Sequence, residues 1–249
     1  MFDRFSQSGT WIDYDTDKEI KKKANRISEL IPAEVKTILD VGCGNGIITN
    51  LLAEKWDVTG LDSSREALEH VKAEKVLSSA TELPFDDNSF DLVMSSEMLE
   101  HLNDSYLAKA IAEIIRVDRK YILITVPNSE YLPLSQTKCP KCSTVFHAWH
   151  HLQSFTKSRL TSMFMAHFRL VHYETSGARQ KQWIPFLLKL KHSLGQWMHP
   201  GATGVCPACG NTDFPKSKKN ILTKAVNFLN LVLSGRKPYW QMFLFEKKQ

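Results

Sequence analysis

Residues 36–46 read KTILDVGCGNG, an apolar stretch that runs into a turn containing three glycines. We predict a buried strand over Lys36–Val41 and a helix directly after the turn, because helical spacing resumes there. Gly42 and Gly44 permit a tight turn and let a ligand approach the backbone closely, while Gly46 lets the first helical turn pack near the sheet. A glycine loop placed between a strand and a helix indicates a nucleotide-like ligand.

Two aspartates accompany this glycine loop. Asp40 stands at the end of the predicted strand, where it can reach an amino group of the ligand or an ordering water. Asp62 lies 16 positions after Gly46, at the end of the next predicted strand, and a carboxylate there can accept both hydrogen bonds from a ribose diol. The G-x-G-x-G spacing differs from the G-x-G-x-x-G of dinucleotide-binding folds, which are the competing interpretation. The sequence therefore favours an adenosine with a short amino-acid tail over a ligand with a diphosphate.

The order of the predicted elements defines the fold class. Strands and helices alternate, which predicts an α/β, Rossmann-like parallel sheet with helices on both faces. We expect one domain over residues 1–249, with insertions at about 128–155 and 176–238 that form a lid. The predicted helices are 18–30, 47–55, 64–73, 106–116, 157–167 and 221–233, and the predicted strands are 36–41, 58–61, 76–77, 90–95, 121–126, 168–174 and 239–245.

Three motifs occur in the order found in one enzyme family. They are LDVGCGNG at 39–46, GLDSS at 60–64 and SSATELPFDDNSFDLVMSSEMLEHL at 78–102. Together they resemble the class I S-adenosylmethionine-dependent methyltransferases over roughly residues 35–175. Within that class, the chain is similar to the subgroup of methyltransferase type 11 and quinone-pathway enzymes. The resemblance implies that S-adenosylmethionine is the cofactor.

The resemblance also implies roles for single residues. Asp40 and the three loop glycines would contact the methionine part of the cofactor. Asp62, with Ser63 beside it, would hold the ribose, and Ala80 would meet the adenine ring through its backbone. Ser95 or Ser96 would close the site. Ser79 stands where the family often has Asp, the acceptor of the adenine amino group. Adenine recognition would therefore be either weaker or carried by the Ser79 hydroxyl.

Glu97, Glu100 and His101 are spaced i, i+3 and i+4, which places them on one face if the segment is helical. Two carboxylates and an imidazole can hold a divalent cation such as Mg²⁺, which would orient substrate hydroxyls. A fourth ligand would come from His147, His150 or His151. The motif EMLEH at 97–101 resembles that of metal-dependent O-methyltransferases that act in quinone pathways or on small RNAs. In the alternative interpretation these residues line the pocket, and His101 or His151 is a metal-free general base.

Four of the five cysteines form two Cys-Pro-x-Cys pairs, and the fifth is Cys43 in the glycine loop. Each pair forms a knuckle in which a tight turn presents two thiolates to one ion. Cys139, Cys142, Cys206 and Cys209 are therefore predicted to bind a structural zinc that joins the two insertions. The alternative is two reduced pairs without metal.

The charge is unevenly distributed along the chain. Between Thr175 and Phe245 the only acid is Asp213, so this segment carries +9 while the whole chain carries +5. The segment is either a solvated basic face or a surface that meets phosphate of RNA, of a nucleotide-linked sugar or of an anionic lipid. Its bases are Arg179, Lys181, Lys189, Lys191, Lys216, Lys218, Lys219, Lys224, Arg236 and Lys237.

The predicted helix Ile221–Leu233 lies within this basic segment. It is amphipathic, with Ile221, Ala225, Phe228, Leu229 and Val232 on one face. We expect this apolar face to pack on the domain. The alternative is a helix that lies on a membrane surface, flanked by lysines.

The leading hypothesis is a methyltransferase that acts on an oxygen or nitrogen of a small molecule, a glycan or a lipid intermediate. The alternatives are an RNA methyltransferase and a catalytically silent binding protein of the same fold. No apolar run approaches the ~20 residues that span a bilayer, and the N-terminus has no basic start followed by an apolar core. We therefore expect a cytoplasmic protein, with peripheral membrane contact through the basic segment as an option.

Overall fold

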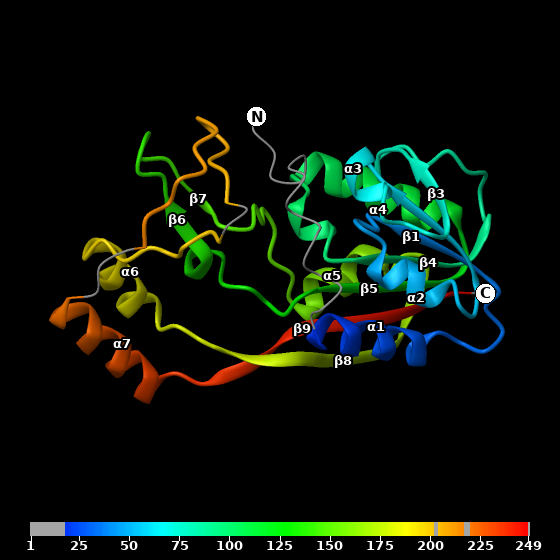
Figure 1. The fold of residues 1–249 in the computed structure, drawn as a ribbon. Helices are drawn as coiled ribbons and strands as arrows, with labels where there is room; N and C mark the ends of the chain where they lie inside the picture. Colours follow the sequence, from blue (N-terminus) through cyan, green and yellow to red (C-terminus); the bar gives the residue numbers. More distant parts are fainter. Residues whose placement is uncertain (1–17, 202–203, 217–219, 249) are drawn as a thin grey trace.

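A computed structural model describes residues 18–201, 204–216 and 220–248, and its centre is a seven-stranded sheet ordered β3-β2-β1-β4-β5-β9-β8 (Figure 1). Neighbouring strands from β3 to β5 pair in parallel, and β9 pairs antiparallel with both β5 and β8. The predicted Rossmann-like α/β class is therefore confirmed. The strands are β1 (Thr37–Val41), β2 (Asp57–Asp62), β3 (Glu74–Leu77), β4 (Phe90–Ser96), β5 (Asp118–Pro127), β8 (Phe168–Lys181) and β9 (Arg236–Lys247).

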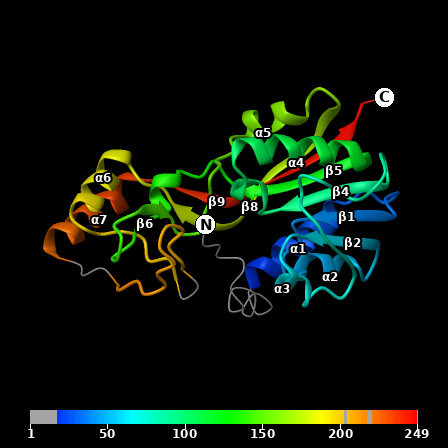
Figure 2. The same ribbon diagram turned by 90° about the horizontal axis from the view of Figure 1, so that it is seen from above.

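Helices cover both faces of this sheet (Figure 2). Buried residues of α1 and α2 pack on one face, and those of α4 and α5 pack on the other. Strand β4 shows why both faces are apolar: Leu92 and Met94 join the α1 side, whereas Val93 joins the α4 side, because successive strand residues point in opposite directions. The helices of this region are α1 (Lys18–Leu30), α2 (Ile47–Leu52), α3 (Arg65–Leu68), α4 (Asp104–Val117) and α5 (Lys157–Phe164).

The predicted bounds agree best with the observed bounds where the hydrophobic pattern is long and regular. α1 and α7 (Ile221–Leu233) begin and end as predicted, whereas α2, α3 and α5 are shorter than predicted. β8 continues past its predicted end at Glu174, because β9 supplies a partner as far as Arg236. Helix α6 (Pro185–Ser193) was not predicted, although a proline at its first position is a known start signal.

A second region extends from the end of the sheet. Beyond the last β5 pair, Pro127 with Trp240, strands β8 and β9 continue as a two-stranded ribbon that leads to α6 and α7 (Figure 1). A small antiparallel pair, β6 (Gln136–Lys138) and β7 (Val145–His147), follows the 3-10 turn η4 (Leu132–Ser135). The backbone N–H of Met198 donates to the carbonyl of Gln136 at 3.0 Å, which ties the two insertions together. The N-terminal stretch before residue 18, together with Lys218 and Lys219, lies outside the described residues.

Helix α7 has the opposite orientation to the one predicted. The face of Ile221, Phe228 and Val232 points to solvent, and these side chains are 82%, 67% and 64% exposed. The buried face contains Thr223, Val226 and Asn230. Asn230 determines this orientation, because its amide accepts from the backbone N–H of residue 184 and donates to the carbonyl of residue 182, each at 3.0 Å. The expectation that the apolar face packs on the domain is therefore wrong.

Candidate functional site

The glycine loop lies at the carboxyl end of β1, the edge where parallel sheets bind ligands. The backbone N–H groups of Gly42 and Cys43 both donate to the carbonyl of Leu61, at 2.7 and 3.0 Å, and this holds the loop against β2. Gly42 has φ +76°, and a Cβ there would collide with the side chain of Met98. Gly46, the N-cap of α2, has φ +75°, and its Cβ would lie 2.8 Å from Cγ2 of Val71. This loop, called the glycine cradle below, therefore packs against Met98 and Val71, and a side chain at Gly42 or Gly46 would strain it.

Asp62 connects this cradle to the end of β2. One carboxylate oxygen accepts from the backbone N–H of Gly44 at 2.9 Å, and the other accepts from Ser64 N–H at 2.8 Å. Each carboxylate oxygen has further acceptor capacity. The carboxylate is thus fixed beside the glycine loop by two backbone hydrogen bonds.

Asp40 is buried beneath the loop. Its Oδ2 accepts from the hydroxyl of Thr49 at 2.7 Å, whereas its buried Oδ1 has no hydrogen-bond partner among the described residues. Burial raises the pKa of the Asp40 carboxyl to about 6, and the Thr49 hydroxyl partly opposes this rise. A buried carboxylate oxygen without a donor fits a ligand ammonium or a water that completes its hydrogen bonding.

The serines named from the sequence follow neighbouring strands at the same edge. Ser63 is exposed directly after β2, and Ser79 follows β3, where its hydroxyl bonds with that of Thr81 at 2.8 Å. Ser95 is buried, and Ser96 bonds through its hydroxyl with Thr125 at 2.9 Å. Ala80 is half-buried beside Ser79 and packs against the core. The structure thus brings the cofactor candidates to one edge of the sheet.

Glu97 does not share a helical face with Glu100 and His101. Glu97 has φ +56° and precedes a single 3-10 turn, η3 (Leu99–His101), so the continuous helix that the i, i+3, i+4 argument needs is not formed. One oxygen of Glu97 lies 3.1 Å from Nζ of the buried Lys23, and the other accepts from the indole N–H of Trp240 at 2.9 Å. Glu97 is therefore held by α1 and β9.

Glu100 and His101 instead meet His151, which comes from the first insertion. The three offer ligand atoms that all lie within 4.8 Å of one another. Glu100 is 1% exposed, and neither of its carboxylate oxygens has a hydrogen-bond partner among the described residues. Burial, and then the nearby Glu97, raise the pKa of Glu100 well above its ordinary value, while burial beside His151 lowers the pKa of His101. The cluster therefore combines neutral imidazole with a carboxyl group that lacks a partner.

Glu130 orients His151. The carboxylate of Glu130 lies 2.5 Å from Nδ1 of His151 and 3.1 Å from Nε2 of His147. Although burial acts to raise it, hydrogen bonds from the two histidines lower the pKa of the Glu130 carboxyl to about 2. Because Nδ1 of His151 is engaged by Glu130, its Nε2 is the nitrogen left for a ligand or a proton.

The other two candidate histidines are engaged elsewhere. His147 uses both ring nitrogens, since its Nδ1 accepts from the backbone N–H groups of Trp149 and His151 at 3.3 and 3.1 Å. His150 lies with Nε2 3.1 Å from the carbonyl of Val205. Of the three histidines considered, His151 is the one that joins Glu100 and His101.

The four paired cysteines form a second cluster. Sγ of Cys139 lies 3.7 Å from Sγ of Cys209, and Sγ of Cys142 lies 3.6 Å from Sγ of Cys206. These separations exclude disulfides, whereas Zn–S bonds of about 2.3 Å in a tetrahedron place sulfurs about 3.8 Å apart. The knuckles share one backbone pattern, because Cys139 and Cys206 each donate through N–H to the carbonyl five residues later, at 2.9 Å. The geometry therefore suits one tetrahedral ion between the two insertions.

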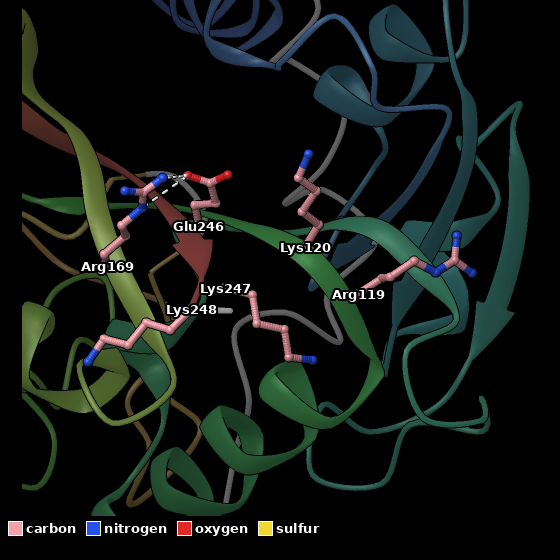
Figure 3. A pocket seen from close by; sticks show the side chains of 6 residues that line it. All are labelled: Arg119, Lys120, Arg169, Glu246, Lys247 and Lys248. Atoms are coloured by element: carbon pink, nitrogen blue, oxygen red, sulfur yellow. Dashed lines mark hydrogen bonds and ion pairs between the residues drawn. The ribbon is translucent and has the colours of Figure 1, made fainter.

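A basic hollow of about 480 Å³ lies at the other end of the sheet (Figure 3). Its walls come from the start of β5, the start of β8 and the end of β9. This is the edge at which the parallel strands begin. Arg169 is paired with Glu246 at 2.6 Å, and Lys120 is paired with Glu34 at 2.8 Å. The hollow is remote from the glycine loop and is not part of the site. It is lined by Arg119, Lys120, Arg169, Glu246, Lys247 and Lys248.

Sequence reasoning missed three residues of the site, namely Lys23, Glu130 and Trp240. Lys23 had a signal, because it shares the buried face of α1 with Ala24 and Ile27, where a lysine is out of place. Glu130 lies in an irregular segment after β5, and no periodicity singles it out. Trp240 reads as an ordinary strand residue.

Comparison with known proteins finds relatives of part of this chain. Residues 39–121 match the family described as methyltransferase domain. An uncharacterised protein of Methanocaldococcus jannaschii is 33% identical over 138 residues, which are 49% of this chain and 60% of that protein. The ubiquinone biosynthesis O-methyltransferase of Neisseria meningitidis is 28% identical over 105 residues, covering 36% of this chain and 44% of that enzyme. The chain thus spans about half the length of these relatives.

Among the solved structures that resemble this chain over most of its length, two illustrate the likeness. One is a SAM-dependent methyltransferase from Archaeoglobus fulgidus, with a TM-score of 0.54 and 20% identity over 92% of this chain and 93% of that one. The other is a protein of Pyrococcus horikoshii, with a TM-score of 0.60 and 14% identity over 96% and 95% of the two chains. At these identities the likeness concerns the fold.

Proposed function

We propose that this chain, which carries a class I S-adenosylmethionine-dependent methyltransferase domain, transfers the methyl group to an oxygen or nitrogen of a small-molecule, glycan or lipid-intermediate acceptor. The observation that carries the proposal is the joint placement of the glycine cradle, Asp40 and Asp62 at one edge of the sheet. A binding protein without turnover would have the same cradle. The acceptor side of the site must therefore distinguish an active methyltransferase from such a binding protein.

The residues present fit the cofactor. Gly42 and Gly44, both at positive φ, would leave bare backbone for the methionine part. Oδ1 of Asp40, which has no partner among the described residues, suits its ammonium, directly or through water. Asp62 would hold the ribose while it keeps its two backbone hydrogen bonds. When bound, S-adenosylmethionine supplies a methyl group on a sulfonium. The chain then needs to align the acceptor and remove its proton.

Glu100, His101 and His151 would activate the acceptor by holding a divalent cation. A buried carboxylate without a donor is costly, and a cation would satisfy it. Two imidazoles and one carboxylate suit a transition ion such as Mn²⁺ or Fe²⁺ better than Mg²⁺, which prefers oxygen ligands. Glu130 would orient His151 from behind, the arrangement usual for metal-bound histidine. The alternative is that Nε2 of His151 removes the proton without a metal.

Zinc at the four cysteines would be structural, because four thiolates leave no coordination position for a substrate. Its effect would be to hold the β6–β7 pair of the first insertion against the second insertion. His151 belongs to the first insertion, so the zinc would also stabilise the segment that completes the acceptor side.

Binding of S-adenosylhomocysteine, measured by calorimetry, tests the cofactor assignment. We expect Asp62→Ala to weaken binding about tenfold to hundredfold, because a charge-assisted hydrogen bond contributes about 1.5–3 kcal/mol. Asp57→Ala is the matched control, because Asp57 is exposed at the other end of the same strand. If the wild-type chain does not bind S-adenosylhomocysteine, the proposed function is wrong.

Binding of Mn²⁺ tests the acceptor side. We expect Glu100→Gln to weaken Mn²⁺ binding at least about hundredfold. Glu130→Gln should weaken it about tenfold to hundredfold, because Glu130 holds the ring of the ligand His151. Exposed Glu69→Gln is the control. Equal Mn²⁺ binding by wild type and Glu100→Gln would exclude the cation and leave His151 as the general base. Incubation with methyl-labelled cofactor and total RNA or total lipid extract then separates an RNA acceptor from a lipid one.

A further inference from the structure

The α6–α7 pair, meaning helices Pro185–Ser193 and Ile221–Leu233, carries most of the large exposed apolar side chains in the described part of the chain. Nine of the sixteen large hydrophobic residues exposed in the described part of the chain lie on these two helices. On α6, Phe186 is 71% exposed while Leu187 and Leu188 are buried. The members on α7 include Ile221, Leu222, Phe228, Leu231, Val232 and Leu233.

Polar anchors on the inner side hold this apolar face outward. Asn230 is fully buried and bonds to the backbone on both sides of Trp183. Asn227 donates to the side chain of the buried Gln196 at 3.3 Å, and Asn220 closes a capping box with Thr223 at the start of α7. If α7 rotated about its axis to bury Phe228, Asn230 would lose these hydrogen-bond partners. The outward face is thus a feature of the folded chain.

Basic residues border the face. Lys189 on α6 and Lys224 on α7 are exposed, as are Arg179 and Arg236 at the end of the ribbon. Nζ of Lys191 lies 4.6 Å from the ring centroid of Trp183, so an aromatic and a cation adjoin at the base of α6. Neither helix contains an acidic residue. An apolar stripe with a basic rim and no acid complements an anionic lipid surface, where apolar side chains enter the interface and lysines meet phosphate.

We propose that the α6–α7 pair binds the surface of an anionic membrane, with α7 lying flat in the interface. Helix α7 has 13 residues, which is about 20 Å of helix and suits the plane of the interface. None of the described helices is long and apolar enough to cross a bilayer. A second copy of this chain is a poorer occupant, because it would bring two basic rims together. This inference does not depend on methyl transfer.

Flotation of the 249-residue chain, purified in the presence of zinc, with vesicles tests the proposal. We expect the chain to float with an equimolar mixture of phosphatidylcholine and phosphatidylglycerol, and about tenfold less with phosphatidylcholine alone. Raising the salt concentration should release it. Failure to float with the anionic mixture, or equal flotation with both compositions, overturns the proposal.

Two pairs of variants locate the binding surface. The double variant Phe228→Ser with Val232→Ser should lower flotation about tenfold, and Lys189→Gln with Lys224→Gln should lower it several-fold. The matched controls are Leu77→Ser with Met165→Ser and Lys21→Gln with Lys72→Gln, all at exposed positions on the sheet domain. Because all these side chains are exposed, the variants should fold, which circular dichroism checks. Equal flotation of the α7 variant and the wild type overturns the proposal. The proposal also fails if the wild-type chain does not float but forms a dimer, and if the α7 variant is a monomer.

Discussion

Helices α1 and α7 both have 13 residues and both are amphipathic, yet they use their apolar faces in opposite ways. Ile27 of α1 is fully buried against the sheet, whereas Ile221 of α7 is 82% exposed. The difference is in what each helix is attached to. α1 packs on a broad apolar sheet face, while α7 is attached through Asn230 to the backbone of a narrow ribbon tip. Periodicity therefore identifies which residues share a face, and the neighbouring elements decide where that face points.

The largest effect should come from breaking the cysteine cluster. Structural zinc contributes roughly 10 kcal/mol to the folding of small zinc domains. We expect Cys206→Ser to lose zinc and to expose residues 136–147 and 204–215 to rapid hydrogen exchange, while the sheet domain keeps its protection. Cys43→Ser is the control, because Cys43 lies in the glycine loop. Full zinc content in Cys206→Ser would contradict the four-thiolate site.

The comparison of the two helices can be tested directly. Ile27→Ala should lower the free energy of unfolding by about 2–5 kcal/mol, because it leaves a cavity in a packed core. Ile221→Ala should change it by less than about 0.5 kcal/mol, as at other exposed positions. Chemical denaturation of both variants gives the answer. A large loss for Ile221→Ala would mean that the α7 face is buried in solution.

The glycine loop offers a matched pair of substitutions. Gly42 and Gly195 have φ values of +76° and +78°, but a Cβ would collide with Met98 only at Gly42, since nothing lies within 4 Å at Gly195. Gly195→Ala should cost about 1 kcal/mol from backbone strain alone, and Gly42→Ala should cost about 1–3 kcal/mol more from overpacking. We expect the affinity for S-adenosylhomocysteine to fall about hundredfold in Gly42→Ala and to stay unchanged in Gly195→Ala. Equal affinities would show that the loop does not form the cradle.

The smallest expected effect is a pH dependence set by Asp40. Burial raises its pKa in the folded chain to about 6, above the ordinary 3.8, so the folded state binds this proton more tightly than the unfolded state. Stability from this group is therefore lost as the pH rises from about 4 to 6 and changes no further above that. A ligand ammonium prefers the carboxylate, so the affinity for S-adenosylhomocysteine should fall up to about tenfold per pH unit below about pH 6. Calorimetry should show this slope in wild type and none in Asp40→Asn.

The candidate site also contains one part that the sequence predicts and one part that only the fold brings together. The residues around the glycine loop are near one another in sequence or follow adjacent strands, so the order of motifs was enough to predict their common edge. Glu97 was misplaced because its backbone adopts φ +56° before a single 3-10 turn. Lys23, Glu130 and Trp240 come from α1, an irregular segment and the last strand. Such contacts between distant segments leave no local pattern.

By itself, the sequence determined the α/β class, the glycine loop at the end of β1 and the gathering of the four cysteines into one cluster. These follow from local rules: strand and helix periods, backbone conformations that glycine permits, and the thiolate geometry of a knuckle. Only the tertiary structure decided which histidine joins Glu100 and His101, and that the apolar face of α7 is turned to solvent. The physical reason is that a buried polar group must find its partners wherever the fold places them. Asn230 finds backbone partners 46 and 48 residues away, and Glu130 finds histidine partners 17 and 21 residues away. None of these spacings belongs to a helix or strand period, so no local pattern predicts these contacts.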